Sequence, residues 1–339
     1  MANELAQRIR QKSYQLGFDL CGFTSAASPV HKSYFLTWLQ DKKFAGMDWL
    51  GRNTDKRLNP FRILPGSKSI IVFGVSYHHE LDSERDYKVA RYAHGEDYHR
   101  WMFEKIEALA AFIKTEIRPD LAWRSFVDTG PVIERDLAVQ AGLGWIGKNT
   151  CLLNEALGSY VFLGVLISNL DLSQDAPVLD KCLDCRLCVD ACPTGALKPY
   201  ELEPQKCLAY QNIERRGPRD ESIFTSLEDH LVGCDVCQEV CPFNFEIAES
   251  QQTVWLSGFK NFDLGDFKKI LQMTTGDYKR KTKDSAMSRI RYPDFMRNVF
   301  LVIAASARQD LWDAVLGWQA AHPDLDLAEY DYCLKKIRN

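Results

Sequence analysis

The sequence lacks the features that would place the protein in a membrane or send it across one. Its longest apolar runs, residues 70–75 and 160–167, fall far short of the roughly 18 residues that a membrane-spanning helix needs. The first residues, MANELAQRIRQKS, are charged and amphipathic, with neither the apolar core of a signal peptide nor a twin-arginine pair. We therefore expect a soluble, cytoplasmic monomer with no membrane partner.

The chain also lacks an excess of positive charge. Its 339 residues carry 42 Lys and Arg against 46 Asp and Glu, so the net charge of −4 gives no general attraction for nucleic acid. Any such binding needs a local basic patch. Apolar residues make up 46% and charged residues 26%, which is a globular composition and excludes a disordered or collagen-like chain. At roughly 150 residues per domain, the length predicts two or three domains.

Cysteines are abundant and unevenly placed. Eight of the 11 fall within residues 182–241. A disulfide scaffold would be short and secreted, so the clustering favours metal binding in a reducing compartment. The run Cys-x2-Cys-x2-Cys-x3-Cys-Pro over residues 182–193 is the bacterial ferredoxin pattern. A shorter run, Cys-x2-Cys-x3-Cys-Pro, covers residues 234–242, with Cys207 upstream. Two sets of four thiolates are what two [4Fe–4S] clusters require.

Loop geometry divides these thiolates between the two clusters. Three thiolates at Cys-x2-Cys spacing wrap three corners of one cubane, and the fourth, which precedes proline, turns toward the other cluster. The first cluster is therefore assigned to Cys182, Cys185, Cys188 and Cys241, and the second to Cys192, Cys207, Cys234 and Cys237. Zinc also binds Cys-x2-Cys pairs, but structural zinc rarely uses this triple run, so iron–sulfur is favoured. The isolated Cys21, Cys151 and Cys333 are expected to be buried, inert thiols.

The apolar pattern of residues 1–175 predicts one domain built on a single sheet. Short β-branched and aromatic runs predict strands over 69–77, 124–127 and 160–168, and helical spacing predicts helices over 3–17, 99–117 and 132–141. Pro131 is expected at the start of the last helix, where its missing N–H costs nothing. Alternating strands and helices favour an α/β domain.

The rest of the chain predicts two further parts. Residues 176–250 are short on apolar runs and punctuated by proline, as in a ferredoxin-like module held together by metal. Residues 251–339 show helical spacing over 294–308, 310–321 and 327–337, which predicts an α-helical, HEAT-like segment. The whole chain is therefore predicted to be α+β.

A glycine-rich segment resembles nucleotide-binding motifs but lacks their context. G-x-G-x-x-G covers residues 142–147, yet a helix precedes it and a strand-like run follows it, which reverses the order of a dinucleotide site. Read as a phosphate loop, the segment has Asn149 where Ser or Thr would bind magnesium. Nucleotide binding is not favoured, although such a loop lets the backbone approach a flat or bulky cofactor.

Two iron–sulfur clusters carry single electrons and do not by themselves transform an organic substrate. Residues 1–175 must therefore dock an electron partner or hold the reacting cofactor, for which a flavin and a corrinoid are candidates. The corrinoid signature Asp-x-His-x-x-Gly is not met, because Met102 stands at its glycine position after Asp97 and His99. His99, on an amphipathic helix, is interpreted as an ordinary buried polar residue, so cobalt would have no protein ligand.

Several segments in order resemble the epoxyqueuosine reductase family. They are MDWL (47–50), ILPGSKSIIV (63–72), ARYAHGEDYHR (90–100), FVDTGPVIERDLAVQAGLGWIGKNT (126–150), the two cysteine runs and SRIRYPDFMRN (288–298). The resemblance implies the last step of queuosine formation in tRNA, removal of the epoxide oxygen of epoxyqueuosine at the wobble position. It also implies cobalamin bound by the first domain, two [4Fe–4S] clusters and an external low-potential electron donor.

The resemblance assigns roles to individual residues. It implies that Asp128 is the proton donor, and desolvation beside an apolar cofactor should raise its pKa as a general acid requires. From the residues alone, Asp128 could instead cap the helix beginning at Pro131. The implied cobalamin contacts are Arg57, Tyr98, Asp128, Lys148, Asn149, Ser159 and Gln211. Arg57 and Lys148 have an equal alternative as surface charges.

A basic patch in the helical segment is the candidate tRNA surface. Its predicted contacts are Lys279, Arg280, Lys281, Lys283, Arg289, Arg291 and Arg297, joined by Arg215 and Arg216 from the module. Tyr278 and Tyr292 lie among them in sequence, and aromatic rings between arginines suit unstacked loop bases. Basic runs are usually solvated faces, but this one accompanies a predicted active domain. Strongly salt-dependent tRNA binding is expected.

Three other readings compete with this one. A corrinoid reductase of a small molecule, such as a dehalogenase, would share the cofactors but not the need for RNA. A non-catalytic electron carrier would use its first domain only to dock a partner. A zinc-scaffolded nucleic-acid-binding protein would be colourless and free of iron and sulfide.

Overall fold

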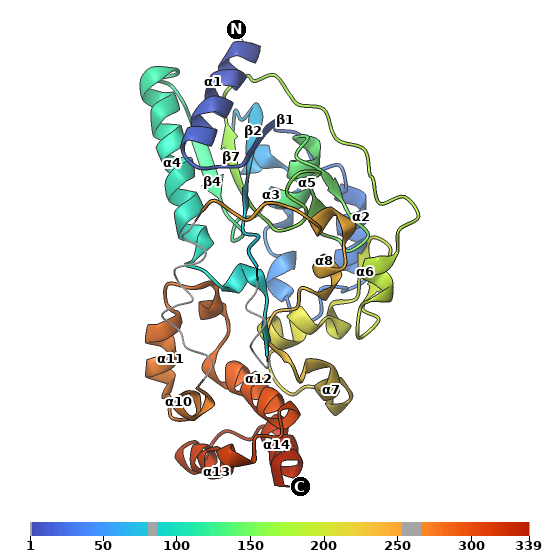
Figure 1. Cartoon of the computed structure of the whole chain (residues 1–339). Coiled ribbons are helices and arrows are strands. Elements are labelled where there is room, and N and C mark those ends of the chain that lie inside the picture. The colour runs from blue at the N-terminus through green and yellow to red at the C-terminus, as the bar shows by residue number, and fades with distance from the viewer. Residues whose placement is uncertain (1, 81–86, 253–265, 339) are drawn as a thin grey trace.

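The computed structural model describes residues 2–80, 87–252 and 266–338. Figure 1 shows a sheet domain above, the helical end below it, and the cysteine-rich segments with α6 and α8 to one side. Across the described ranges, every helix is too short or too polar to cross a membrane. The predicted helical segment 251–339 includes residues 253–265 and 339, which lie outside the described residues.

The sheet domain is built on four antiparallel strands. Their order is β1 (Leu20–Ser25), β2 (Ser69–Ser76), β7 (Val161–Ser168) and β4 (Trp123–Phe126). The three strands predicted from β-branched and aromatic runs are confirmed. Strand β1 was not predicted, because Gly22 and its polar neighbours interrupt the apolar run. Since every pairing is antiparallel, the domain is α+β rather than a parallel α/β sheet.

Helices cover both faces of this sheet because its strands are apolar on both sides. Alternate residues of β2 enter two cores: Ile71 and Phe73 pack with α1 (Ala2–Gln15) and α4 (Tyr98–Glu116), whereas Ile70 and Val72 pack with α5 (Glu134–Gln140). Figure 1 shows α1 and α4 along one side of the sheet. The remaining elements before residue 153 are α2 (Lys32–Gln40), α3 (Thr54–Arg57), β3 (Lys88–Val89), β5 (Trp145–Ile146) and β6 (Leu152–Leu153).

Helix α5 begins later than predicted. We expected a helix over 132–141 with Pro131 in its first turn, but α5 starts at Glu134 after the N-cap residue Ile133. The Arg57 guanidinium donates from Nη1 to the carbonyl oxygens of Gly130 and Val132, both at 3.3 Å. These two contacts hold the segment before Glu134, which lies outside the helix.

The cysteine-rich part consists of very short elements. They are α6 (Leu187–Asp190), the hairpin β8 (Leu197–Lys198) and β9 (Glu201–Leu202), α7 (Phe224–Leu227), β10 (His230–Val232) and α8 (Val236–Glu239). Strand β10 pairs in parallel with β3, so the module is joined to the sheet domain by backbone hydrogen bonds as well as by side chains.

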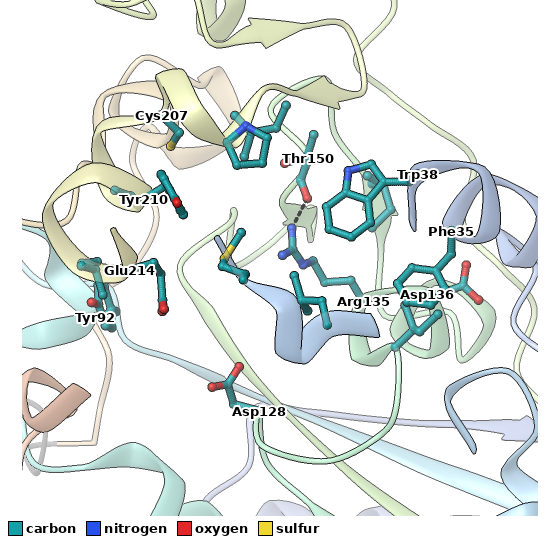
Figure 2. A pocket seen from close by; sticks show the side chains of 18 of the residues that line it. Phe35, Trp38, Tyr92, Asp128, Arg135, Asp136, Thr150, Cys207, Tyr210 and Glu214 are labelled. Atoms are coloured by element: carbon teal, nitrogen blue, oxygen red, sulfur yellow. Dashed lines mark hydrogen bonds between the residues drawn. The ribbon is translucent and has the colours of Figure 1, made fainter. Parts of the chain in front are cut away.

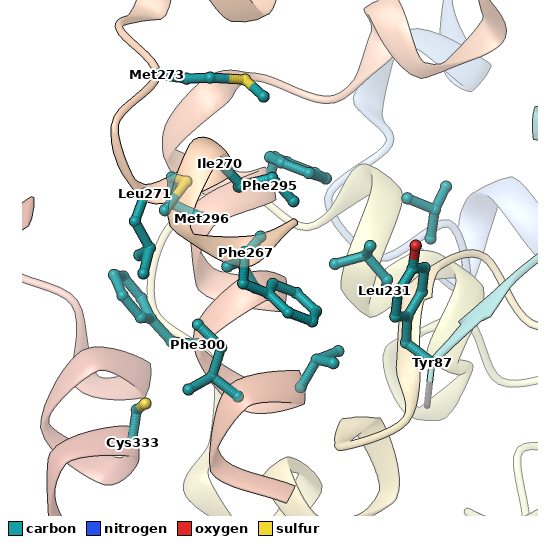
Figure 3. Packing of buried hydrophobic residues seen from close by; sticks show 14 of the residues in the cluster. Tyr87, Leu231, Phe267, Ile270, Leu271, Met273, Phe295, Met296, Phe300 and Cys333 are labelled. Atoms are coloured by element: carbon teal, nitrogen blue, oxygen red, sulfur yellow. The ribbon is translucent and has the colours of Figure 1, made fainter. Parts of the chain in front are cut away.

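The C-terminal helices enclose the third core. They are α10 (Phe267–Leu271), α11 (Thr275–Thr282), α12 (Tyr292–Ala305), α13 (Trp312–Ala321) and α14 (Ala328–Arg338). The three helices predicted here from apolar spacing are confirmed, and α12 packs along α14. Figure 3 shows Tyr87 and Leu231, from the first two predicted parts, beside Phe267 of α10. The described packing thus crosses the domain limits at 175 and 250, which remain predictions.

The glycine-rich segment is explained by close packing of the β5–β6 hairpin. A Cβ atom on Gly144 would lie 2.0 Å from the Leu153 carbonyl oxygen, and one on Gly142 would lie 2.6 Å from that of Ala176. Both glycines also have positive φ, +157° and +70° respectively. The backbone itself therefore requires glycine at these positions.

We expect Gly144→Ala to lower the free energy of unfolding by about 2–3 kcal/mol, because both the contact and the φ angle oppose a side chain. Urea unfolding followed by far-ultraviolet circular dichroism measures this change. The matched control is Gly317→Ala in α13, where a new Cβ meets nothing within 4 Å. That variant should be about 1 kcal/mol more stable, since alanine favours a helix. Equal effects at the two positions would contradict the packing explanation.

Candidate functional site

A cavity of about 1240 Å³ lies where the three predicted parts meet. It is larger than the roughly 300–1,000 Å³ of ordinary small-molecule pockets, so it suits a bulky group. Aromatic side chains of α2 and its neighbours form one wall, and module residues Cys207, Tyr210 and Glu214 form another. In the view of Figure 2, Asp128 and Cys207 lie on opposite sides of the cavity.

Asp128 lies on the loop between β4 and α5 and faces this cavity. Its backbone takes the left-handed conformation, with φ +56°, which is unusual for a residue with a side chain. The backbone N–H of Asp128 donates to Glu134 Oε1 at 2.7 Å, and its carboxylate Oδ2 lies 3.2 Å from His99 Nε2. The N-cap position of α5 is Ile133, so the alternative in which Asp128 caps this helix is wrong.

The pKa of Asp128 moves opposite to our expectation. The hydrogen bond from His99 lowers it, and this outweighs the desolvation that we expected to raise it. Burial lowers the pKa of His99, but hydrogen bonds to Asp128 and Asp97 outweigh burial and raise it to about 9. At neutral pH the proton of this pair therefore resides on His99, which we had interpreted as an ordinary buried polar residue. The clue in the sequence was Asp97, two positions before His99.

Glu134 is a second carboxyl at the same place that the sequence analysis missed. Burial, followed by the neighbouring charge of Asp128, raises the pKa of Glu134 to about 8. Its side chain is therefore protonated at neutral pH while it accepts the Asp128 backbone N–H. Glutamate at the start of a helix is common, so its position alone gave no signal of a functional role.

The cysteine thiols influence one another within the two predicted sets. Burial, together with the nearby thiols of Cys182, Cys188 and Cys185, raises the pKa of Cys241 to about 11. Burial likewise raises the pKa of Cys234 to about 12, with Cys207 and Cys192 as neighbouring thiols. Within the described ranges, no three Cys, His, Asp or Glu side chains converge as ligands of a single ion would.

The first cysteine set reaches the solvent, whereas the second reaches the cavity. Cys185, in the first set, is exposed to solvent. Cys207, in the second set, lines the cavity. The second set is completed by Cys237, whose pKa burial raises well above its usual value, with Cys151 and Cys234 as the nearest thiols.

The three isolated cysteines do not behave alike. Cys21 and Cys333 are buried, and burial raises the pKa of each to about 12, as expected of inert thiols. Cys151 is only partly buried and lies beside Cys237. It is therefore next to the second set rather than isolated in a core.

Of the cobalamin contacts implied by resemblance, Tyr98 and Asp128 line the cavity. The other five do not appear among the described lining residues and have partners elsewhere. Arg57 binds the loop after Asp128, as described above. Lys148 Nζ donates to the carbonyl oxygen of Cys185 at 2.9 Å, and Asn149 Nδ2 donates to that of Cys237 at 3.3 Å. Ser159 Oγ donates to Gln238 at 2.9 Å, and Gln211 Nε2 donates to the Gln205 carbonyl oxygen. Lys148 and Asn149 thus contact the cysteine loops directly.

Gln211 retains one unused group. Its side chain is buried, and its Oε1 atom has no hydrogen-bond partner among the described residues. A buried acceptor without a donor is costly, so it is a natural position for an N–H group of a ligand.

The predicted basic patch is mostly exposed, with two exceptions. Arg215 is half-buried and donates to the Pro218 carbonyl oxygen, whereas Arg216, Lys279, Arg280, Lys281, Lys283, Arg289 and Arg291 are exposed. Arg289 also lines the cavity, pairs with Glu214 and lies 5.2 Å from the centre of the Trp49 ring. Arg297, however, is 4% exposed and pairs with Glu329 at 3.0 Å, so it does not lie on the surface where we expected it.

The two tyrosines between these basic residues are not available for stacking on bases. Tyr278 and Tyr292 are buried in the C-terminal core, where their hydroxyl groups donate to the carbonyl oxygens of Ile290 and Met273. Our expectation that they stack on RNA bases is therefore wrong. Periodicity explains the error, because both rings lie on the inward faces of their helices.

We expect Arg297→Met to reduce stability rather than RNA affinity. Removing Arg297 takes away the 3.0 Å contact to buried Glu329, which keeps only the longer contact to Arg219 at 3.4 Å, and this should cost about 3 kcal/mol of unfolding free energy. Urea unfolding and a filter-binding assay with tRNA, run on the same preparation, separate the two effects. Lys279→Met, at an exposed position, is the control and should weaken tRNA binding without changing stability. Weaker tRNA binding by Arg297→Met at unchanged stability would contradict this assignment.

Comparisons with known proteins point to one family. Residues 57–129 match a family described as "Epoxyqueuosine reductase QueG, DUF1730", and residues 181–244 match a 4Fe-4S double cluster binding domain. The epoxyqueuosine reductase of Escherichia coli (strain K12) is 32% identical over 336 residues, which cover 96% of this chain and 87% of that protein. The fold and the double-cluster domain thus define an iron–sulfur oxidoreductase.

Solved structures show the same fold. The epoxyqueuosine reductase of Streptococcus thermophilus is 26% identical with a TM-score of 0.87, covering 98% of this chain and 90% of that one. An epoxyqueuosine reductase solved with an epoxyqueuosine-modified tRNA stem loop is 22% identical with a TM-score of 0.80, covering 99% of each chain. This chain belongs to the epoxyqueuosine reductase family. That membership disfavours both the non-catalytic carrier and the zinc scaffold.

Proposed function

We propose that this protein reduces epoxyqueuosine at the wobble position of tRNA to queuosine, using cobalamin, two [4Fe–4S] clusters and Asp128 as proton donor. The observation that carries the proposal is the cavity itself, which has the acid pair His99–Asp128 on one side and Cys207 on the other. A proton source and an electron exit thus face the same space.

The residues present fit a corrinoid in this cavity. The volume exceeds that of ordinary pockets, and the aromatic walls suit the apolar faces of a macrocycle. Gln211 does not line the cavity itself, but it follows Tyr210, which does, and its buried Oε1 lacks a donor that an amide N–H of the corrin rim could supply. Reduced cobalt would supply low-potential electrons to the substrate. Tyr98, stacked on Phe162 with ring centres 3.8 Å apart, would support it from the sheet side.

The eight predicted cysteine ligands fit two clusters placed in series. An external low-potential donor would deliver electrons at the set containing exposed Cys185, and they would pass to the set containing Cys207. Thiolate ligands must lose their protons, and burial raises the pKa of several of these thiols, so cluster assembly would release protons.

Asp128 would act on the oxygen that leaves the substrate. Its carboxyl faces the cavity, so a proton that it receives from His99 can pass directly to that oxygen. The exposed lysines and arginines around Arg289 would hold the phosphates of the anticodon stem loop. Cation–phosphate contacts of this kind weaken steeply with salt.

The test is anaerobic incubation of the protein, loaded with clusters and cobalamin, with epoxyqueuosine-containing tRNA and a low-potential reductant. Nucleoside digestion and mass spectrometry should show loss of one oxygen from the modified base. Parallel reactions without cobalamin or without reductant should leave the tRNA unchanged. Absence of conversion by protein that holds both clusters and cobalamin would refute the proposed function.

A further inference from the structure

His99 lies in the middle of a chain of three side chains that ends at the proposed acid. Its Nδ1 atom is 2.6 Å from Asp97 Oδ1, and its Nε2 atom is 3.2 Å from Asp128 Oδ2. Asp97 also accepts the backbone N–H of His99 at 3.0 Å, because it is the N-cap residue of α4. The start of a helix therefore fixes Asp97, and Asp97 fixes the ring.

The contacts determine how many protons the chain holds. Both ring nitrogens face carboxyl oxygens, and a nitrogen lone pair directed at a carboxylate oxygen would be repulsive. One proton must therefore lie on Nδ1, toward Asp97, and a second must lie between Nε2 and Asp128. This second proton belongs either to an imidazolium facing a carboxylate or to a carboxylic acid facing a neutral imidazole.

We propose that His99, oriented by Asp97, is a positioning residue that holds the proton which Asp128 delivers to the substrate. The proposal rests on the function proposed above and adds the source of the proton. It also explains how Asp128 can act as an acid although it is ionised before the reaction: the proton is stored one hydrogen bond away, on Nε2.

The overall reaction needs two such deliveries. An epoxide, two electrons and two protons give an alkene and one water molecule, and the external low-potential one-electron donor supplies the electrons. Each proton passes from His99 Nε2 to Asp128 and from there to the oxygen, as the first and then the second C–O bond breaks. After each transfer the neutral ring keeps its Nδ1–H, which donates to Asp97, and a proton from bulk solvent returns to Nε2.

The surrounding charges favour storage on His99. Glu134 beneath Asp128 is protonated and so adds no negative charge, while Arg135 and Arg289 act on Asp128 and lower its pKa. The titratable and charged groups that face this pair or its partners are Arg57, Tyr92, Asp97, Tyr98, Arg100, Asp128, Glu134, Arg135 and Arg289.

The deciding experiment compares the pH dependence of single turnover in the wild type and His99→Gln, both loaded with clusters and cobalamin. Glutamine can still donate to Asp128 but has no proton to give. The wild-type rate should fall as pH rises through about 9, the pKa of His99. At pH 7.5 the variant should be about 100-fold slower at unchanged tRNA affinity, and it should regain activity toward the ordinary pKa of a carboxyl, near 4.

Two further variants keep the test decisive. Asp97→Asn retains the helix cap but removes the negative charge that faces His99 Nδ1, so the alkaline limb of the rate profile should move to lower pH by about one unit or more. His322→Gln, at a histidine far from the cavity that bonds the Trp318 carbonyl, should leave the profile unchanged. A wild-type pH profile in both His99→Gln and Asp97→Asn would overturn the proposal.

The proposal can also be tested without turnover, through the pH dependence of the melting temperature. Because the pKa of His99 is raised, its ionisation stabilises the fold below the unfolded-state pKa near 6.5, and this contribution is lost as pH rises through about 9. The difference in melting temperature between wild type and His99→Gln should therefore shrink between pH 6.5 and 9. A constant difference would overturn the proposal even with an active wild type. Failure of the wild type to convert tRNA would instead refute the proposed function.

Discussion

Asp128→Asn should lower the rate of epoxyqueuosine reduction by about 100- to 10,000-fold, the range that general acid catalysis contributes. Asparagine has the shape of aspartate and can still bond His99, but it cannot accept a proton from Nε2 and pass it on. Single-turnover reactions under anaerobic conditions, with the product quantified by mass spectrometry, measure the rate. Cobalamin content and tRNA affinity should be unchanged.

The control for this variant is Asp120→Asn, an exposed aspartate that pairs with Arg118 on the surface beyond α4. It removes the same charge without touching the cavity, so its rate should equal that of the wild type. Full activity of Asp128→Asn would remove this residue from the mechanism. Loss of cobalamin from the variant would show instead that Asp128 serves to hold the cofactor.

Cys241→Ser should remove one cluster completely and leave the other. Cys241 is far in sequence from residues 182–188, but its nearest thiols are Cys182, Cys185 and Cys188. We therefore expect iron to fall from about eight to about four per chain, since each cluster holds four. Turnover should be lost, because the path from the surface to the cavity is broken.

The matching variant in the other set is Cys192→Ser, which should spare the first cluster and remove the second. Electron paramagnetic resonance of the reduced proteins distinguishes the two remaining clusters. Cys333→Ser, in a fully buried thiol of α14, should retain about eight irons. Cys185→Ser, in the first run, should remove the same cluster as Cys241→Ser; if it removed the cluster lost in Cys192→Ser instead, the crossed assignment of the two cysteine runs would be wrong.

Much of the fold was predictable from local patterns. Strands β2 and β7 are continuous apolar runs, and helices α4 and α12 carry strong apolar periodicity, so each was located from sequence. Strand β1 was not, because its burial comes from pairing with β2 rather than from its own composition. The loop before α5 is bound by Arg57, more than 70 residues earlier, and no local pattern reports such a contact.

Only the part of the site that depends on residue spacing, the cysteine ligands, was predictable from the sequence. The cysteine runs define their metal through intervals along the chain, so the sequence alone indicated two clusters. The resemblance suggested Asp128, but the pKa of Asp128 depends on a hydrogen bond from His99, which lies 29 residues earlier on α4. Tyr278 and Arg297 point inward because of packing between helices, and a run of basic residues in the sequence does not indicate that packing.

The composite wall of the cavity has a consequence for the lifetime of the protein. Segments from all three predicted parts of the chain line this cavity, so a ligand bound in it would contact all three and stabilise their packing. Ligand present at 100 times its dissociation constant would add about 2.7 kcal/mol to the stability of the folded state. If the proposed cobalamin is that ligand, protein lacking it should be cleaved more readily by added protease than protein that holds it.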